Sequence, residues 1–287
     1  MRANPPPLFL LLLLLPAAPL CRAGEAEPSY GLSRPTPREA LRPMSTDRPD
    51  ATESPYTVDA GRAQLEMEVF SYLTDSRNPE GAPVRTRELA LFATNFKVGV
   101  TRRVDVQIAL APHTIARTED TQTGASAESE GFGDVGVRVK VNLWGNDGGD
   151  TACAALPFVT FPTGQDGLGS GEVEGGVAFP LAVALPGGFG LGAMVQLSAA
   201  RAADGTGHVL EFVHTTTVSR AIVGDLAGFL ELAGAVTAES GARWEATLNA
   251  GLTYAATEDL LLDVGVNVGL TRAAGDVRVF FGVSRRF

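Results

Sequence analysis

The most constraining feature of this sequence is an alternation of apolar and polar residues that recurs from about residue 62 to residue 287. It is clearest at residues 134–143, 243–254, 260–270 and 276–287. Successive side chains of a β-strand point to opposite faces, so each of these segments has one apolar face and one polar face. The pattern predicts an all-β chain whose strands each separate an apolar environment from a polar one.

About twelve strands are expected, and several are longer than the ~5–6 residues usual in soluble sheets. Their length matches the ~9–11 residues with which a tilted strand crosses a bilayer. They lie at about 62–73, 86–100, 103–111, 132–143, 151–161, 173–185, 188–199, 208–219, 223–236, 242–255, 260–270 and 276–287.

The connections between these strands alternate in length. The first, third and fifth are long, whereas the second, sixth and tenth are short. Outer-membrane barrels have long external loops and tight periplasmic turns. Trp244 and Tyr254 stand at opposite ends of one apolar face, where barrels carry their aromatic girdles. We therefore predict a transmembrane antiparallel up-and-down β-barrel with a narrow polar lumen, in contact with outer-membrane lipid.

The N-terminus has the pattern of a secretory signal peptide, with Arg2 followed by a leucine-rich core and a cleavage point after Ala23. The predicted division is therefore a signal peptide at 1–23, a flexible extension at 24–43, an acidic proline-containing segment at 44–61 and a barrel at 62–287. An alternative treats Cys21 as a lipidated residue, although the flanking residues fit a lipoprotein signal poorly.

Composition excludes several classes of function. A net charge of −10 argues against nucleic-acid binding, which needs basic patches. The three histidines show no metal-ligand spacing, and no G-x-S-x-G motif is present. His214 and Ser219 share one predicted strand but face opposite sides of it. We therefore expect no catalytic residue, no metal and no cofactor.

The segment "STDRPDATESPYTV", residues 45–58, precedes the first predicted strand. Its prolines interrupt both helix and ladder hydrogen bonding. One hypothesis is that it enters the periplasmic mouth of the barrel as a plug; the other is that it is only a turn-rich leader. Its charged candidates for contacts inside a plugged barrel are Asp47, Arg48, Asp50 and Glu53. A divalent-cation site on its three acids is a weaker alternative, because their spacing matches no calcium loop.

The polar faces of the strands are predicted to point into the lumen, where mixed charges either pair across it or line a water path. The lumen-lining candidates are Glu66, Glu68, Lys97, Asp105, Arg138, Lys140, Asn142, Glu231, Glu245, Asn249, Asp263, Asn267 and Arg278.

Two motifs give the chain a family resemblance. "STDRPDATESPYTVDAGRAQLE" and "LPFVTFPTGQ" resemble the outer-membrane barrel family named after a MetA pathway of phenol degradation, and the resemblance covers about residues 44–287. It implies a closed barrel that passes small solutes, including hydrophobic or aromatic compounds. The ending at Phe287 also resembles the signal by which barrel-assembly machinery recognises such proteins, although Arg285 departs from that pattern.

Three hypotheses follow. The first is an outer-membrane channel with both mature termini in the periplasm. The second is a structural or adhesion barrel that acts through long external loops near 112–131 and 162–172. The third is an outer-membrane hydrolase, for which the sequence offers no catalytic cluster.

Overall fold

The computed structural model describes residues 30–287, except 78–80, 166, 204 and 206. The predicted signal peptide at 1–23, with Cys21, and residues 24–29 of the predicted extension lie outside this range. Two 3-10 turns, η1 (Arg38–Ala40) and η2 (Pro186–Gly188), are the helical elements of the described part. None of its helices is long and apolar enough to cross a membrane.

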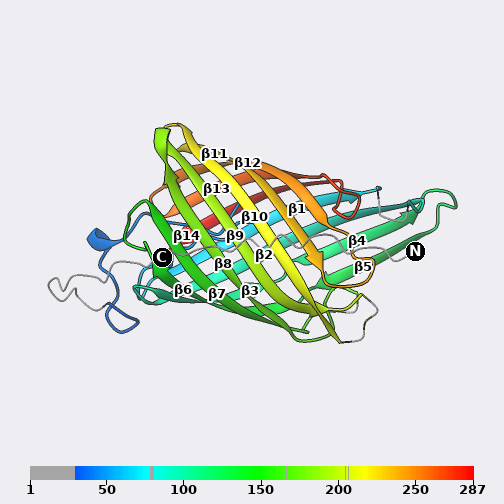
Figure 1. Cartoon of the computed structure of the whole chain (residues 1–287), viewed down its shortest axis with the longest axis horizontal. Coiled ribbons are helices and arrows are strands. Elements are labelled where there is room, and N and C mark those ends of the chain that lie inside the picture. The colour runs from blue at the N-terminus through cyan, green and yellow to red at the C-terminus, as the bar shows by residue number, and fades with distance from the viewer. Residues whose placement is uncertain (1–29, 78–80, 166, 204, 206) are drawn as a thin grey trace, which may run out of the picture.

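The described chain forms one antiparallel sheet that closes on itself (Figure 1). Its segments are β1 (Ala63–Asp75), β2 (Val84–Thr101), β3 (Val104–Leu110), β4 (His113–Asp120), β5 (Ser126–Phe132), β6 (Val135–Trp144), β7 (Thr151–Phe161), β8 (Glu174–Leu185), β9 (Phe189–Arg201), β10 (His208–Val223), β11 (Leu226–Thr237), β12 (Glu245–Thr257), β13 (Leu260–Gly269) and β14 (Val277–Arg286). The barrel closes because β1 pairs with both β14 and β2.

These segments make a twelve-stranded wall, as predicted. β3 and β4 both pair with the long strand β2, which makes them two parts of one wall strand. β5 pairs with β4, and β6 pairs with β3. These two segments therefore form a second interrupted strand of the wall. The interruption between β3 and β4 lies next to Phe92 of β2, whose φ of 62° is unusual for an aromatic residue.

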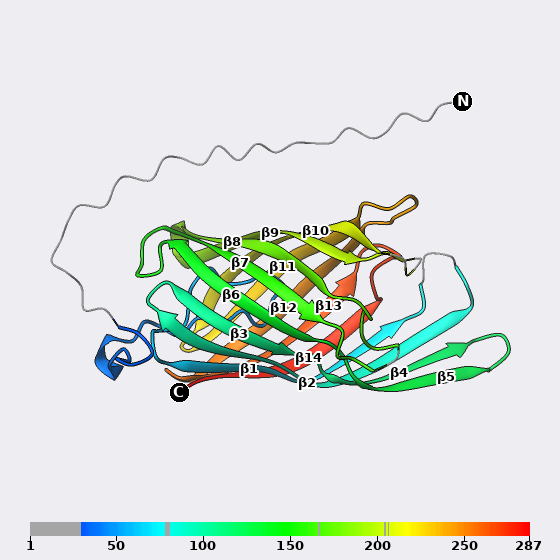
Figure 2. The same ribbon diagram turned by 90° about the horizontal axis from the view of Figure 1, so that it is seen from below.

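The segment 112–131, predicted as a long external loop, contains two strands. β4 and β5 form a hairpin that continues beyond the barrel wall (Figure 2). Most residues from 117 to 128, among them Arg117 and Glu128, are exposed to solvent, so this outer part of the hairpin has no apolar face. A hairpin whose two faces both contact water has no alternation of apolar and polar residues, so the strand pattern does not reveal it.

The two ends of the barrel differ in the length of their connections. At one end, here called the turn end, the strands are joined by residues 102–103, 145–150, 186–188, 224–225 and 258–259. At the other, the loop end, the connections are 76–83, 121–125, 162–173, 202–207, 238–244 and 270–276. The chain begins β1 and ends β14 at the turn end (Figure 2).

The wall is apolar outside and polar inside. Leu230 and Leu232 of β11 are each 56% exposed, whereas Glu231 between them is 1% exposed. Trp244 and Tyr254 lie on the outer face near opposite ends of β12 and are about half exposed. An exposed apolar band around a buried polar interior reverses the arrangement of a soluble protein and fits a wall that faces lipid.

Asp134 fixes the long connection 162–173 at the loop end. Its carboxylate accepts hydrogen bonds from the backbone N–H groups of Gly164 and Ser170, at 2.8 and 2.7 Å, and from the Ser170 hydroxyl at 2.9 Å. Gln165 adds a second attachment, because its side-chain oxygen accepts from the Phe132 N–H at 3.0 Å. The motif "FPTGQ" therefore ties one loop to the point where β5 meets β6.

We expect Asp134→Ala to release this connection without opening the barrel. Charge-assisted hydrogen bonds contribute about 1.5–3 kcal/mol each, and three would be lost. Proteinase K should cleave within 162–173 about ten times faster, while the folded barrel keeps its heat-modifiable gel mobility. Glu128→Ala, on the exposed hairpin, is the control, and equal cleavage rates in the two variants would contradict this role of Asp134.

Candidate functional site

The segment 45–58, here called the plug, lies inside the barrel near its turn end and has no regular secondary structure. Side chains of β1, β2, β3, β6, β10, β11 and β13 bond to it. Because these strands lie on several sides of the wall, the plug crosses the lumen.

Asp47 is the charged centre of the plug. Its carboxylate bonds to the ammonium groups of Lys97 on β2 and Lys140 on β6, and all three side chains are at most 6% exposed. Glu66 of β1 pairs with Lys97 and accepts a hydrogen bond from the Asp47 N–H at 3.0 Å. Burial by itself would raise the pKa of Asp47, but Lys140 and Lys97 lower it far below its usual range. Asp47 is therefore ionised, and it neutralises part of a buried basic pair.

Arg48 forms the second anchor. Its guanidinium donates to Asp263 of β13 at 2.7 and 3.2 Å and to Glu68 of β1 at 3.3 Å. It also lies over the ring of Phe280, 5.6 Å from the centroid. A side chain at Gly282 would collide with this guanidinium, since a Cβ there would be 2.4 Å from it. The inner wall is thus shaped around Arg48.

Glu231 of β11 holds the tip of the plug. Its carboxylate accepts from the N–H groups of Ala51 and Thr52, at 2.9 and 2.8 Å, and from the Thr52 hydroxyl at 2.6 Å. Asn249 of β12 donates to the same carboxylate at 2.7 Å. Thr52 reaches one further strand, because its hydroxyl is 2.7 Å from that of Thr215 on β10.

The remainder of the plug is held by β3 and β6. Arg138 pairs with Glu53, and Asn142 donates to the carbonyl oxygen of Pro55 at 2.9 Å. Asp105 accepts from the Val58 N–H at 3.0 Å. Buried backbone N–H groups need acceptors, and in this irregular segment the inward carboxylates supply several of them.

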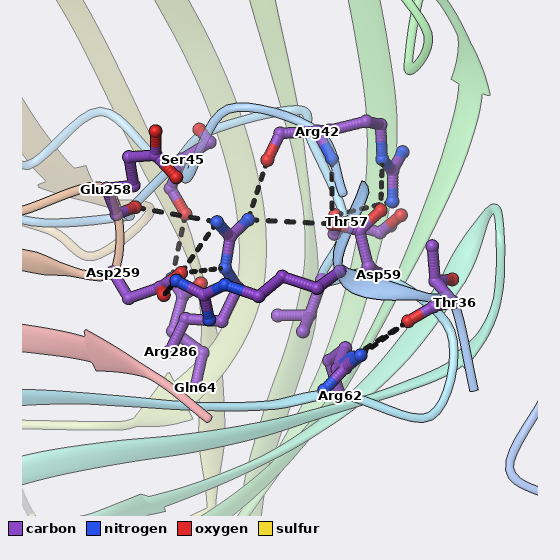
Figure 3. A network of polar contacts seen from close by, with 12 residues as sticks. Thr36, Arg42, Ser45, Thr57, Asp59, Arg62, Gln64, Glu258, Asp259 and Arg286 are labelled. Atoms are coloured by element: carbon purple, nitrogen blue, oxygen red, sulfur yellow. Dashed lines mark hydrogen bonds and ion pairs between the residues drawn. The ribbon is translucent and has the colours of Figure 1, made fainter. Parts of the chain in front are cut away.

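A polar network fixes the chain on both sides of the plug (Figure 3). Arg42 binds Asp59 at 2.7 Å, which joins the residues before the plug to those after it. Arg286 of β14 donates to the Arg42 carbonyl at 2.6 Å and pairs with Asp259 at 2.7 Å. Arg62 donates to the Thr36 carbonyl at 2.9 and 2.7 Å. The plug is therefore tethered where the first and last strands meet.

The sequence-derived candidates fall into two groups. Those in contact with the plug are Glu66, Glu68, Lys97, Asp105, Arg138, Lys140, Asn142, Glu231 and Asp263, and Asn249 bonds to Glu231. Arg278 bonds to Glu68 and to the Ser71 hydroxyl. Glu245 lies exposed at the start of β12, and Asn267 is half-buried opposite Arg278.

The three plug acids do not converge on a cation site. Asp47 turns to two lysines, Glu53 turns to Arg138, and Asp50 faces Glu231. Within the described residues, no group of three His, Cys, Asp or Glu side chains is arranged to hold a metal ion.

Sequence reasoning missed several residues of this site, of which Phe280 is the clearest. This residue is 2% exposed, and the guanidinium groups of Arg48 and Arg278 lie 5.6 and 5.5 Å from the centroid of its ring. The sequence did contain a signal for it: two consecutive phenylalanines, at 280–281, place one ring on each face of β14. Gly265 leaves room for the inner ring, since a Cβ there would be 2.3 Å from it. Thr52 gave no comparable signal, nor did Asn146, whose side-chain oxygen accepts a hydrogen bond from the Thr57 N–H at 3.0 Å.

The comparisons with known structures support the fold. The chain is similar to an outer membrane channel from Pseudomonas putida F1, with 11% identity, a TM-score of 0.62, and 85% of this chain and 100% of that one covered. It is also similar to the β domain of the Bordetella autotransporter BrkA, with 12% identity, a TM-score of 0.51, and 79% and 99% covered. At such identities the likeness shows the fold alone, and that fold is an outer-membrane β-barrel. No curated protein matches the sequence.

The family model described as "Putative MetA-pathway of phenol degradation" matches residues 46–287, and the chain belongs to that family. The match begins inside the plug, so the plug and the barrel fall within one family unit, as the two sequence motifs predicted.

We expect Asp47→Ala to destabilise the protein strongly, because it leaves Lys97 and Lys140 buried without their shared partner. Breaking a buried ion pair on one side typically costs about 3–5 kcal/mol in the free energy of unfolding. Urea unfolding in lipid vesicles, followed by the fluorescence of Trp144 and Trp244, measures it. The double variant Asp47→Ala/Lys140→Met should recover part of the loss. A cost below about 1 kcal/mol would contradict the role of Asp47 as an anchor.

Proposed function

We propose that the protein is an outer-membrane channel for small solutes whose lumen is closed by the plug and opens when the plug moves. The main support is the contrast between the two kinds of contact. Neighbouring strands of the wall are joined by continuous backbone hydrogen bonds. The plug is joined to the wall by hydrogen bonds and ion pairs of wall side chains. Such contacts can be exchanged individually while the barrel stays intact.

Small hydrophobic or aromatic compounds are the proposed solutes. The family description supports this class. So does a cavity of about 340 Å³ at the turn end, which is lined in part by Pro43, Met44, Tyr56 and Val58. Its volume and its mixture of apolar and polar walls are typical of small-molecule sites.

The proposed orientation places the turn end in the periplasm, with both mature termini there after removal of residues 1–23. The unequal connections at the two ends support it. Phe287, which is 57% exposed and donates its N–H to Ala63 at 2.8 Å, is the proposed contact for barrel-assembly machinery.

A second candidate function is adhesion through the loop end. The β4–β5 hairpin favours it, because it projects beyond the wall and exposes an acidic surface that includes Glu128 and Glu130. A hydrolase has no such support. His214 stacks between Phe212 and Trp244 on the outer face, whereas Ser219 borders a cavity inside the barrel.

Planar-bilayer recordings separate these functions. We expect brief steps from the protein beginning at residue 24, and longer, larger steps from a version that lacks residues 24–55. Arg48→Ala, which removes one anchor and no chain, should fall between them. Gel mobility verifies that each barrel is folded. If none of the three folded proteins gives steps, the channel function is wrong and adhesion is the remaining candidate. Removal of residues 121–125 would then test adhesion.

Asp50 should make the closed state depend on pH. Burial, and then the nearby Glu231 carboxylate, raise its pKa to about 7; Glu53 adds to this effect, while Thr217 opposes it. Once the plug is released, the pKa returns toward 3.8. The seated plug therefore binds the proton more tightly, and its stability falls as pH rises from about 4 to 7 and then stays constant.

The expected result is an open probability that increases between pH 5 and pH 7 and levels off above pH 7. Asp50→Asn should abolish this slope and keep the plug seated at pH 7. Single-channel recording across that range measures both, with Glu128→Gln as the control. An identical slope in Asp50→Asn would refute the assignment.

A further inference from the structure

The plug is attached unequally around the barrel. On the side of β1, β2, β6 and β13 it is held by ion pairs of Asp47, Arg48 and Glu53. Toward β8–β10 the contacts of the plug come from hydroxyl groups: that of Thr215 lies 2.7 Å from the Thr52 hydroxyl, and that of Thr217 hydrogen-bonds to Asp50. A neutral hydroxyl contact is weaker than a charge-assisted bond, so the plug separates most easily from β8–β10.

A cavity lies on this weakly attached side. It measures about 480 Å³ and is bordered by the plug, by β8–β10 and by the turn between β8 and β9. Small residues of the wall make this space, among them Ala182, Ala184, Gly190 and Gly192. Tyr56 borders both this cavity and the 340 Å³ cavity at the turn end, so the two spaces adjoin.

Gly192 marks the level at which this space narrows. A Cβ there would be 2.6 Å from the Thr217 methyl group and 3.2 Å from that of Thr52. Beyond it, the buried side chains of Met194 and Thr215 close the gap toward the loop end. A small tilt of the plug that separates Thr52 from Thr215 would widen this level.

The charge on this side is acidic. Asp50 borders the cavity, and Glu211 and Glu245 approach each other nearer the loop end. Glu211 accepts a hydrogen bond from the Ser198 hydroxyl at 2.9 Å. Among the described residues, no basic side chain lies within ion-pair distance of Glu211 or Glu245. β9 and β10 each contain one arginine, Arg201 and Arg220. Both occupy positions that alternate with the inward-facing residues, so they lie on the outer face of the wall.

We propose that solutes pass between the plug and the inner wall of β8–β10, and that this route favours small cationic and neutral molecules over anions. The inference rests on the proposed channel function and adds its path and its selectivity. Unpaired carboxylates in a narrow lumen attract cations and repel anions. An uncharged phenol or an aromatic amine would pass, whereas an aromatic carboxylate such as benzoate would be rejected.

The path is tested by a matched pair of cysteine variants in a Cys153→Ala background. Ser219→Cys borders the cavity, whereas Ser284→Cys lies on the inner face of β14 and is 1% exposed. A cationic methanethiosulfonate reagent should reduce single-channel conductance by at least half in Ser219→Cys and leave Ser284→Cys unchanged. Equal effects in both, or no effect in Ser219→Cys, would overturn the path.

The selectivity is tested by reversal potentials in a potassium chloride gradient. Potassium should permeate more readily than chloride, and Glu211→Gln/Glu245→Gln should lower the permeability ratio at least twofold. Glu128→Gln, on the hairpin, should leave the ratio unchanged. A preference for chloride, or a ratio unaffected in the double variant, would overturn the selectivity.

The recordings also distinguish the two levels of the inference. Steps with the wrong selectivity or the wrong cysteine response overturn only the route and leave the channel in place. Silence from every version, including the one that lacks residues 24–55, overturns the channel and the route together.

Discussion

The structure depends on one constraint: an irregular segment buried inside a barrel must find hydrogen-bond partners outside its own backbone. Helices and strands satisfy their N–H groups internally, but the plug cannot. The inward carboxylates of Glu66, Asp105 and Glu231 accept bonds from its N–H groups. The inner wall is therefore complementary to a peptide backbone, and its acidic residues hold the plug in place in addition to any contact they make with a solute.

Charge follows from the same constraint. A lumen rich in carboxylates needs buried cations, which Lys97, Lys140 and Arg138 provide on one side and Arg48 brings in with the plug. Desolvated charges are tolerated only when they are paired. Ion pairs join the plug to β1, β2, β6 and β13, whereas its bonds to β10 and β11 come from hydroxyl groups and backbone N–H groups.

Much of the fold could be predicted from sequence because a two-residue period reports directly which face of a strand meets lipid. The strand pattern and the unequal connections led to the twelve-stranded barrel, and residues such as Glu231 could be placed on the polar face. Their partners could not, since pairing across a lumen depends on register and on the path of the plug. The β4–β5 hairpin escaped because it faces water on both sides, and Phe280 escaped because an aromatic was expected on the lipid side.

The network around Arg286 links closure of the barrel to the position of the plug. This residue belongs to the last strand, yet it binds the Arg42 carbonyl just ahead of the plug and the turn before β13. The strand that completes the cylinder thus carries the bond that holds the N-terminal segment at its mouth. A barrel that closed without its N-terminal segment would therefore leave the Arg286 guanidinium, at the seam, without one of its bonding partners.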